Sequence, residues 1–305
     1  MAAARDTVTR LTNLQAARQR PGMYLGGMSQ GIDALLWGLI ANSLNEHLRG
    51  CARSLSVEIH ADGSVSVDDD GNGMSAEDAE VGGSAFERRF TVIQGYGGPL
   101  PERHPDVPAS VYLSDRRPVS LGLICALSER LEVETRWAGA LRRAVFSRGL
   151  VLEPLRNLGP TAQQGTTVRL FPDREVFNES CDGYQTRLHP PDVHSRLREL
   201  AWLVPRLNIF CDGQTIQEGS GLAGLLVSEF GTPEPGSSVV VRGTIGSLPI
   251  DISLALARDG LEPRVRGFLN FLPCDSGSHV DGLLEGVRRV YGSRVSECLV
   301  GAIHL

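Results

Sequence analysis

The chain has 305 residues, of which 41% are hydrophobic and 22% are charged. This length and composition indicate a globular protein of two domains and exclude a disordered or collagen-like chain. The formal net charge of −6 gives no basic excess, which disfavours direct DNA binding. No apolar run approaches the roughly 20 residues that a membrane span requires. Because the N-terminus also lacks a hydrophobic signal core, we expect a cytoplasmic protein with no membrane contact.

The cysteines and the basic residues narrow the chemistry further. The six cysteines are scattered, with no CxxC and no paired Cys/His spacing, which argues against a zinc site and against a disulfide framework. All 30 basic residues are arginine, and the chain contains no lysine. Any mechanism that needs a lysine from this chain is therefore excluded.

The first elements are read from turn signals and hydrophobic periodicity. Residues 20–26 form a turn-rich segment after a short helix. Apolar positions spaced by three and four predict a helix over residues 32–49, which ends at Gly50. Residues 54–60 and 64–68 alternate with period two, so they predict two strands of a hairpin.

The middle of the chain is less regular. Glycine, proline and charged residues dominate from residue 82 to residue 120, which predicts a long irregular loop or lid. Residues 119–130 read as a helix. The alternating segments that follow predict strands at 131–136, 141–147, 165–171 and 208–211, with a helix at 193–204 between the last two.

A domain boundary is expected near residue 213. Residues 219–221 and 231–236 are linker-like because they are rich in glycine, serine and proline. The remaining pattern predicts strands at 238–243, 248–257, 264–271 and 298–304 and a helix at 279–294. Both parts therefore read as α+β layers, with domains at 1–212 and 213–305.

Six motifs occur in an order that matches one known family. They are RPGMYLG at 20–26, a helix carrying Asn42 and Glu46, DDGNG at 69–73, GTTV at 165–168, RLRELAWL at 196–203 and SGSHVDG at 276–282. Together they resemble the ATPase (N-terminal) region of bacterial gyrase B and topoisomerase IV ATPase subunits. The resemblance implies a GHKL (Bergerat) ATPase-type α/β sandwich, followed by a transducer domain like ribosomal protein S5.

The resemblance also implies roles for particular residues in binding ATP or ADP with Mg²⁺. Asn42 would hold the metal and phosphate oxygens, and Asp69 would accept a hydrogen bond from the adenine amino group. Thr166 would contact the same aspartate. The other positions that match the nucleotide site are Leu39, Glu46, Val67, Gly71, Gly73, Met74, Arg136 and Val168. Without this context, the acidic segment at 68–73 reads as a simple turn and Asn42 as a solvated side chain.

The phosphate side departs from the family pattern. The catalytic glutamate of the family stands four residues before the helix asparagine, and here that position is Gly38. The glycine-rich phosphate lid is replaced by DRRPVS at 115–120, in which Pro118 has no N–H to donate. The family's catalytic lysine has no counterpart. We therefore expect no catalytic residue in this chain, and weak or absent binding of ATP or ADP with Mg²⁺.

Three functions remain open on these residues. The first is a pseudo-ATPase that acts as a nucleotide-site or protein-interaction module, as a homodimer or with gyrase or topoisomerase IV subunits. The second is the ATPase part of a diverged gyrase or topoisomerase whose missing groups come from a partner. The third is binding of an aminocoumarin-like small molecule through Asn42, Asp69 and Arg136, although the family's turn arginine is Asn72 here.

Overall fold

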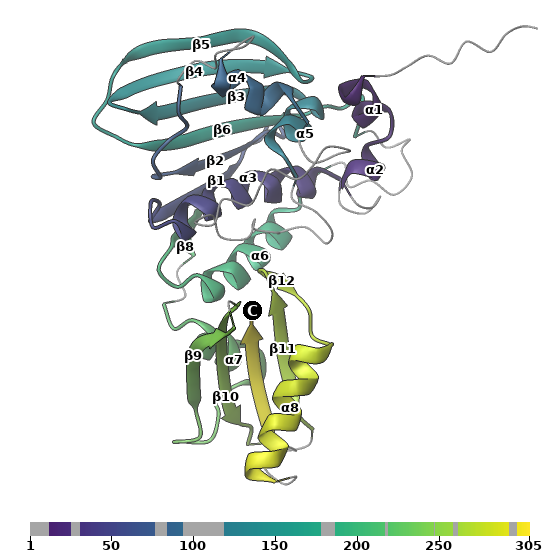
Figure 1. Cartoon of the computed structure of the whole chain (residues 1–305), viewed down its shortest axis with the longest axis vertical. Helices are drawn as coiled ribbons and strands as arrows, with labels where there is room; N and C mark the ends of the chain where they lie inside the picture. The colour runs from purple at the N-terminus through teal and green to yellow at the C-terminus, as the bar shows by residue number, and fades with distance from the viewer. Residues whose placement is uncertain are drawn as a thin grey trace, which may run out of the picture. The chain divides into compact units, whose positions relative to one another are not determined.

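The computed structural model describes residues 12–25, 31–76, 84–93, 119–177, 187–216, 219–246, 248–258, 262–292 and 298–305 (Figure 1). The chain divides into two compact units. The first comprises residues 1–40, 59–107 and 119–188, and the second comprises residues 41–58, 108–118 and 189–305. The domain boundary expected near residue 213 stays a prediction. Within the described ranges, no helix is long and apolar enough to cross a bilayer.

The first unit is an antiparallel sheet with short helices. Its strand order is β5-β4-β3-β6-β2. Its elements are α1 (Asn13–Gln19), α2 (Pro21–Leu25), the start of α3 (Gly31–Leu48), β2 (Val65–Asp69), α4 (Ala85–Thr91), α5 (Leu121–Ala126), β3 (Ser128–Trp137), β4 (Ala140–Ser147), β5 (Leu150–Pro160) and β6 (Gly165–Pro172).

One face of this sheet forms the core of the first unit. Residues that are directly opposite in an antiparallel pair point to the same face, so the register defines rows of side chains across the strands. Helix α4 closes this core, because Phe90 stacks on Phe146 with ring centroids 4.8 Å apart. Two fully apolar rows cross from β2 to β4: Val65, Leu170, Leu131 and Phe146, then Val67, Val168, Val133 and Ala144.

Several local predictions for this unit need correction. Residues 21–25 are helical rather than turn-like, because a proline at the first helical position loses no hydrogen bond. The region expected to be irregular contains α4, whose N-cap Ser84 accepts a hydrogen bond from the Glu87 N–H at 3.2 Å. The helix expected to run to residue 130 ends at Ala126, since β3 begins at Ser128.

Strand β5 was not predicted from the sequence. It is an exposed edge strand with prolines at 154 and 160, and its leucines at 150, 152 and 158 are more than half exposed. Proline is tolerated at a sheet edge, where its missing N–H faces solvent. The helix at 32–49 and the strands at 54–60 and 64–68 are confirmed, and the hairpin turn is closed by a 2.9 Å hydrogen bond from the His60 N–H to the Ser64 carbonyl.

The second unit contains a small parallel pairing and a five-stranded sheet. Strand β1 pairs in parallel with β7, which pairs antiparallel with β8, and the larger sheet has the order β12-β11-β13-β10-β9. Its elements are the end of α3, β1 (Ser54–Ile59), α6 (Pro190–Leu203), β7 (Asn208–Cys211), β8 (Gln214–Ile216), α7 (Leu222–Phe230), β9 (Val239–Ile245), β10 (Leu248–Leu256), β11 (Arg264–Leu269), β12 (Leu272–Pro273), α8 (Ser278–Tyr291) and β13 (Leu299–His304).

The sequence predicts some helices and strands of the second unit and misses others. The seven predicted segments at 193–204, 208–211, 238–243, 248–257, 264–271, 279–294 and 298–304 correspond to α6, β7, β9, β10, β11, α8 and β13. Helix α7 and strand β8 were missed, because α7 lies between the two glycine-rich stretches that read as linkers. Leu222, Leu225 and Leu226 of α7 are buried, and the helix packs on β10 and β13.

Candidate functional site

A row of polar side chains lies at one end of the buried face of the first unit's sheet, next to the apolar rows. Asp69 on β2 is the register partner of Thr166 on β6, which in turn pairs with Thr135 on β3. All three side chains therefore point to the same face as the apolar rows of valine and leucine. They are at most 4% exposed, so each needs a partner for its polar atoms.

Asp69 is held by the turn that follows it. Its side-chain Oδ1 accepts a hydrogen bond from the Gly71 N–H at 3.0 Å, in an Asx-type turn. The carboxylate is only 2% exposed and stands at the end of a strand whose preceding inward residue is Val67. A buried acceptor fixed in this way can recognise a donor such as an amino group on an aromatic ring.

Thr135 was not predicted as part of the site. Its Oγ1 accepts a hydrogen bond from the Met74 N–H at 2.7 Å and donates one to the Met74 carbonyl at 3.0 Å. This reciprocal pair fixes the segment after the DDGNG turn against β3. The signal that could have found Thr135 is its place opposite Thr166, which depends on strand register rather than on a local motif.

Two glycines let the backbone come close at this end of the sheet. Gly73 has φ +76°, and a β-carbon there would lie 2.5 Å from the Arg136 carbonyl oxygen. Gly165 has φ +121°, and a β-carbon there would collide with the carbonyl of Asp69. These positions need glycine both for the backbone conformation and for the close approach.

Arg136 belongs to the opposite face of the sheet. It follows Thr135 in β3, and its guanidinium donates to Asp68 Oδ1 at 2.7 Å, to Thr167 Oγ1 at 2.9 Å and to the Asp69 carbonyl at 3.1 Å. Thr167 also donates to Asp68. The arginine therefore ties the ends of β2, β3 and β6 together, and its predicted contact with a ligand stays a prediction.

The apolar positions predicted around the base are buried in the first unit. Val67, Met74 and Val168 are 3%, 8% and 4% exposed, and Leu39 of α3 is 2% exposed. Because Val67 and Val168 are register partners, they lie one row inward from Asp69 and Thr166. The sheet thus brings together a buried acceptor, an apolar floor and a glycine-lined edge.

The position of the expected general base is crowded. A β-carbon at Gly38 of α3 would lie 3.0 Å from Ile124 Cδ1, 3.0 Å from Val119 Cβ and 3.2 Å from the Val119 carbonyl oxygen. Val119 is 9% exposed and Ile124 of α5 is fully buried. Aliphatic groups therefore occupy the space into which a side chain at position 38 would extend.

The remaining predicted residues lie in the second unit or outside the described ranges. Asn42 and Glu46 are on the part of α3 that belongs to the second unit, where both are half-buried and Glu46 pairs with Arg49 at 3.2 Å. His47 Nδ1 lies 2.8 Å from the Ala52 carbonyl and so links the end of the helix to the segment that follows it. Residues 115–118 of the altered lid lie outside the described residues.

These observations test whether the residues fit ATP. The residues predicted for the adenine are of a kind that suits a planar base, because Asp69 is a buried acceptor and no β-carbon is tolerated at Gly73 or Gly165. Next to Gly38 the fit is poorer, because the three atoms nearest to a β-carbon there belong to Ile124 and Val119, and neither side chain can act as a base.

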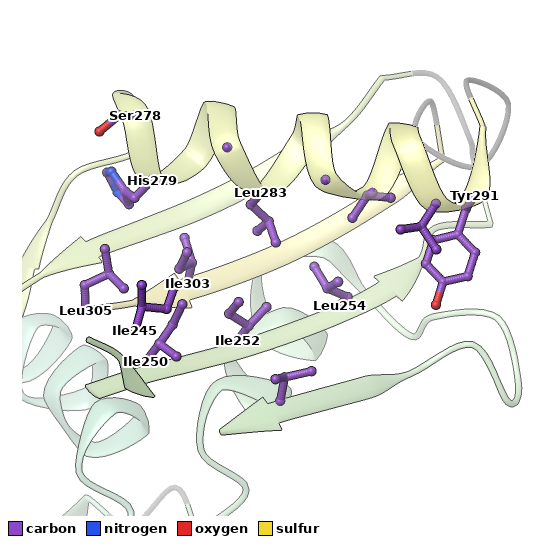
Figure 2. Close-up of a pocket in the computed structure, with 15 residues that line it drawn as sticks. Ile245, Ile250, Ile252, Leu254, Ser278, His279, Leu283, Tyr291, Ile303 and Leu305 are labelled. Atoms are coloured by element: carbon purple, nitrogen blue, oxygen red, sulfur yellow. The ribbon is translucent and has the colours of Figure 1, made fainter. Parts of the chain in front are cut away.

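The second unit carries a separate apolar groove (Figure 2). It lies between α8 and one face of the five-stranded sheet and has a volume of about 550 Å³. Ile250, Ile252 and Leu254 of β10 line its floor with Ile303 of β13, the register partner of Ile252. On the opposite face of the same strands, Ser253 and Ala302 are fully buried.

The fold defines a GHKL-type domain. No family model matches the chain. The structure is similar to the 43K ATPase domain of Thermus thermophilus gyrase B, solved in complex with an aminocoumarin, with a TM-score of 0.74 and 24% identity over 97% of this chain and 82% of that one.

Sequence comparison identifies the family. The chain is 30% identical to the B-type subunit of the type 2 topoisomerase of Aquifex aeolicus and 31% identical to the gyrase B protein of Archaeoglobus fulgidus, over 93% of its length in each case. It covers 36% and 45% of those two proteins, and so spans less than half of their length. The chain belongs to the family of gyrase B and topoisomerase B proteins, in their GHKL-type ATPase region.

Proposed function

We propose that this chain is a gyrase-B-like pseudo-ATPase, a module that senses adenine nucleotides without hydrolysing them and acts through a protein partner. The single observation that carries the proposal is the crowding at Gly38. In the family this position belongs to the general base, and here both the carboxylate and the space for it are absent among the described residues.

The loss of the base has a definite cost. Removing a general base typically slows a reaction by about 10²–10⁴-fold. Neither Val119 nor Ile124 carries a group that could accept a proton from water. Because the chain also has no lysine, it cannot supply a lysine ammonium group to the γ-phosphate. We therefore expect no measurable phosphate release by this chain alone.

The adenine side supports nucleotide recognition. Asp69, Thr166 and the glycine edge would read the base, while Asn42 would be the remaining group for Mg²⁺ or phosphate. Because most of the recognition would lie on the base, ATP and ADP should bind about equally well, and magnesium should change little. The bound nucleotide would then alter a cytoplasmic interaction with gyrase or topoisomerase IV subunits, or with a second copy of the chain.

The test is calorimetric titration with ATP, ADP and a non-hydrolysable ATP analogue, with and without Mg²⁺. The expected result is a similar affinity for all three. Asp69→Asn keeps the hydrogen bond from Gly71 but removes the carboxylate charge, so we expect at least a tenfold loss of affinity, or about 1.4 kcal/mol. Asp70→Asn is the matched control, because Asp70 is the adjacent exposed carboxylate. Its affinity should match that of the unchanged chain.

A second measurement separates the proposal from a diverged, active ATPase. Phosphate release is followed for the unchanged chain and for Gly38→Glu beside an active gyrase. The expected result is a flat baseline for both, because a glutamate at position 38 meets Ile124 and Val119 instead of water. Tight ATP binding that requires magnesium, together with phosphate release, would establish the active alternative. If no nucleotide binds, the nucleotide half of the proposal is wrong.

A further inference from the structure

Three side chains of types that can bind a metal ion meet in the second unit. His194 comes from α6, Cys211 ends β7, and Asp212 begins the turn into β8. Their ligand atoms all lie within 4.8 Å of one another. We propose that His194, Cys211 and Asp212 form a site for a zinc-like divalent metal ion with a fourth position open to water.

The distances are close to those of a tetrahedral zinc site. His194 Nε2 lies 3.6 Å from Asp212 Oδ2, and Cys211 Sγ lies 3.9 Å from the same oxygen. Zinc bonds of about 2.1 Å to nitrogen and oxygen and about 2.3 Å to sulfur, at tetrahedral angles, place such ligand atoms roughly 3.4–3.6 Å apart. These two separations need to shrink by only about 0.2–0.3 Å, and the third, between His194 and Cys211, is at most 4.8 Å.

The backbone fixes two of the three ligands. Cys211 is paired on both sides, with Val57 of β1 and with Gln214 of β8. The Asp212 N–H donates to the Val57 carbonyl at 2.9 Å, and Asp212 has a positive φ of 49° at the start of the tight turn. These contacts fix the backbone of Cys211 and Asp212 without a metal, which is one part of what a preorganised site requires.

The donor set selects the kind of metal. A thiolate and an imidazole favour zinc over magnesium or calcium, which prefer oxygen ligands. Cys211 is fully buried, whereas the His194 and Asp212 side chains are 30% and 37% exposed, so an ion can enter from their side. With the thiolate and the carboxylate as anionic ligands, a divalent ion gives a centre of zero net charge.

The binding step releases one proton. Burial raises the pKa of the Cys211 thiol to about 12. The ion forms a bond to the sulfur, the S–H bond breaks, and the proton passes to solvent. The expectation from the sequence that no zinc site exists considered only spacing along the chain. His194 and Cys211 are brought together by the fold of α6 against β7.

The test uses Co²⁺ as a coloured substitute for Zn²⁺ on the reduced, metal-free chain. The expected result is a thiolate-to-cobalt charge-transfer absorption in the near ultraviolet that saturates at one ion per chain and disappears when Zn²⁺ is added. Cys211→Ser should abolish this band. The matched control is Cys125→Ser, because Cys125 is equally buried and its pKa is also raised to about 12.

A second variant keeps the test valid if Cys211→Ser folds poorly. His194→Gln changes a partly exposed side chain and should lower the Co²⁺ affinity at least tenfold, with the folded spectrum unchanged. Zn²⁺ should raise the Tm of the unchanged chain and of Cys125→Ser, but not that of His194→Gln. The proposal is overturned if no charge-transfer band forms, or if the band persists in Cys211→Ser.

Discussion

Missing β-carbons have opposite consequences at two places in the first unit. At Gly73 and Gly165 they let the backbone approach Arg136 and Asp69, and the polar row on β2, β6 and β3 keeps its shape. At Gly38 the missing side chain leaves room that Val119 and Ile124 occupy. The edge that we propose for adenine therefore depends on its glycines. At Gly38, in contrast, the absence of a side chain lets Ile124 and Val119 pack close to the helix.

Under the proposed function, this comparison gives a physical reason why a binding edge could be kept while a general base is lost. A binding edge is preserved by backbone geometry that few substitutions can satisfy, because both the φ angle and the packing demand glycine. A general base depends on a single side chain and on open space around it. Once the side chain is lost, aliphatic groups can fill the space and gain contact with the core, which makes the loss difficult to reverse.

The largest expected effect tests the glycine edge. Gly165→Ala combines strain at positive φ with a collision against the Asp69 carbonyl, so we expect it to lower the free energy of unfolding by about 3–5 kcal/mol. Gly159→Ala is the matched control, because Gly159 has φ +130° with no atom within 4 Å of a β-carbon. It should lose only the strain, about 1–3 kcal/mol.

Urea denaturation of both variants measures the difference. A loss in Gly165→Ala no larger than that in Gly159→Ala would contradict the close approach of β6 to Asp69. In that case the close approach would not require glycine at position 165, and the contrast with Gly38 would no longer hold.

A smaller loss of stability is expected where Thr135 holds the segment that follows the DDGNG turn. Thr135→Val keeps the shape of the side chain but leaves the Met74 N–H and carbonyl without their partner, so we expect a loss of about 2–3 kcal/mol in unfolding free energy. Thr215→Val, at an exposed position of β8, should change stability by less than about 0.5 kcal/mol. Thermal denaturation compares the two. Equal effects would show that Met74 does not depend on Thr135.

The sequence was sufficient for the parts of the site that a local motif encodes. The DDGNG turn placed Asp69 at the end of a strand, and alternation along 165–171 placed Thr166 and Val168 on one face. Thr135 was not predicted, because a threonine inside a strand has no local sequence signature. Its role follows from the register between β3 and β6, which tertiary pairing determines.

The elements that the sequence did not predict were missed for similar reasons. Strand β5 is exposed and contains prolines, so it lacks the alternation by which half-buried strands are recognised. Helix α4 was masked by the glycines and prolines around it, although Phe86 and Phe90 are spaced by four residues and buried. The sequence predicts that Gly38 stands where the family has its general base, but the approach of Ile124 to that position depends on the packing of α5.

The smallest expected effect tests that occupied space directly. Ala stabilises a helix interior over Gly by about 0.5–1 kcal/mol, provided that the new β-carbon has room. Gly286→Ala on α8 has that room, since no atom lies within 4 Å of a β-carbon there, and it should gain this amount. Gly38→Ala should gain less than half as much, because Ile124 and Val119 crowd the same group. Denaturant unfolding resolves the difference.

Removing the crowding atom sharpens the same test. Ile124→Val deletes the Cδ1 that lies 3.0 Å from a β-carbon at position 38. In that background Gly38→Ala should regain about 0.5 kcal/mol, which a double-mutant cycle measures as coupling. Additive changes, together with a full gain for Gly38→Ala alone, would mean that the space beside α3 is open. A glutamate could then be accommodated there, and the case for a closed catalytic position would fail.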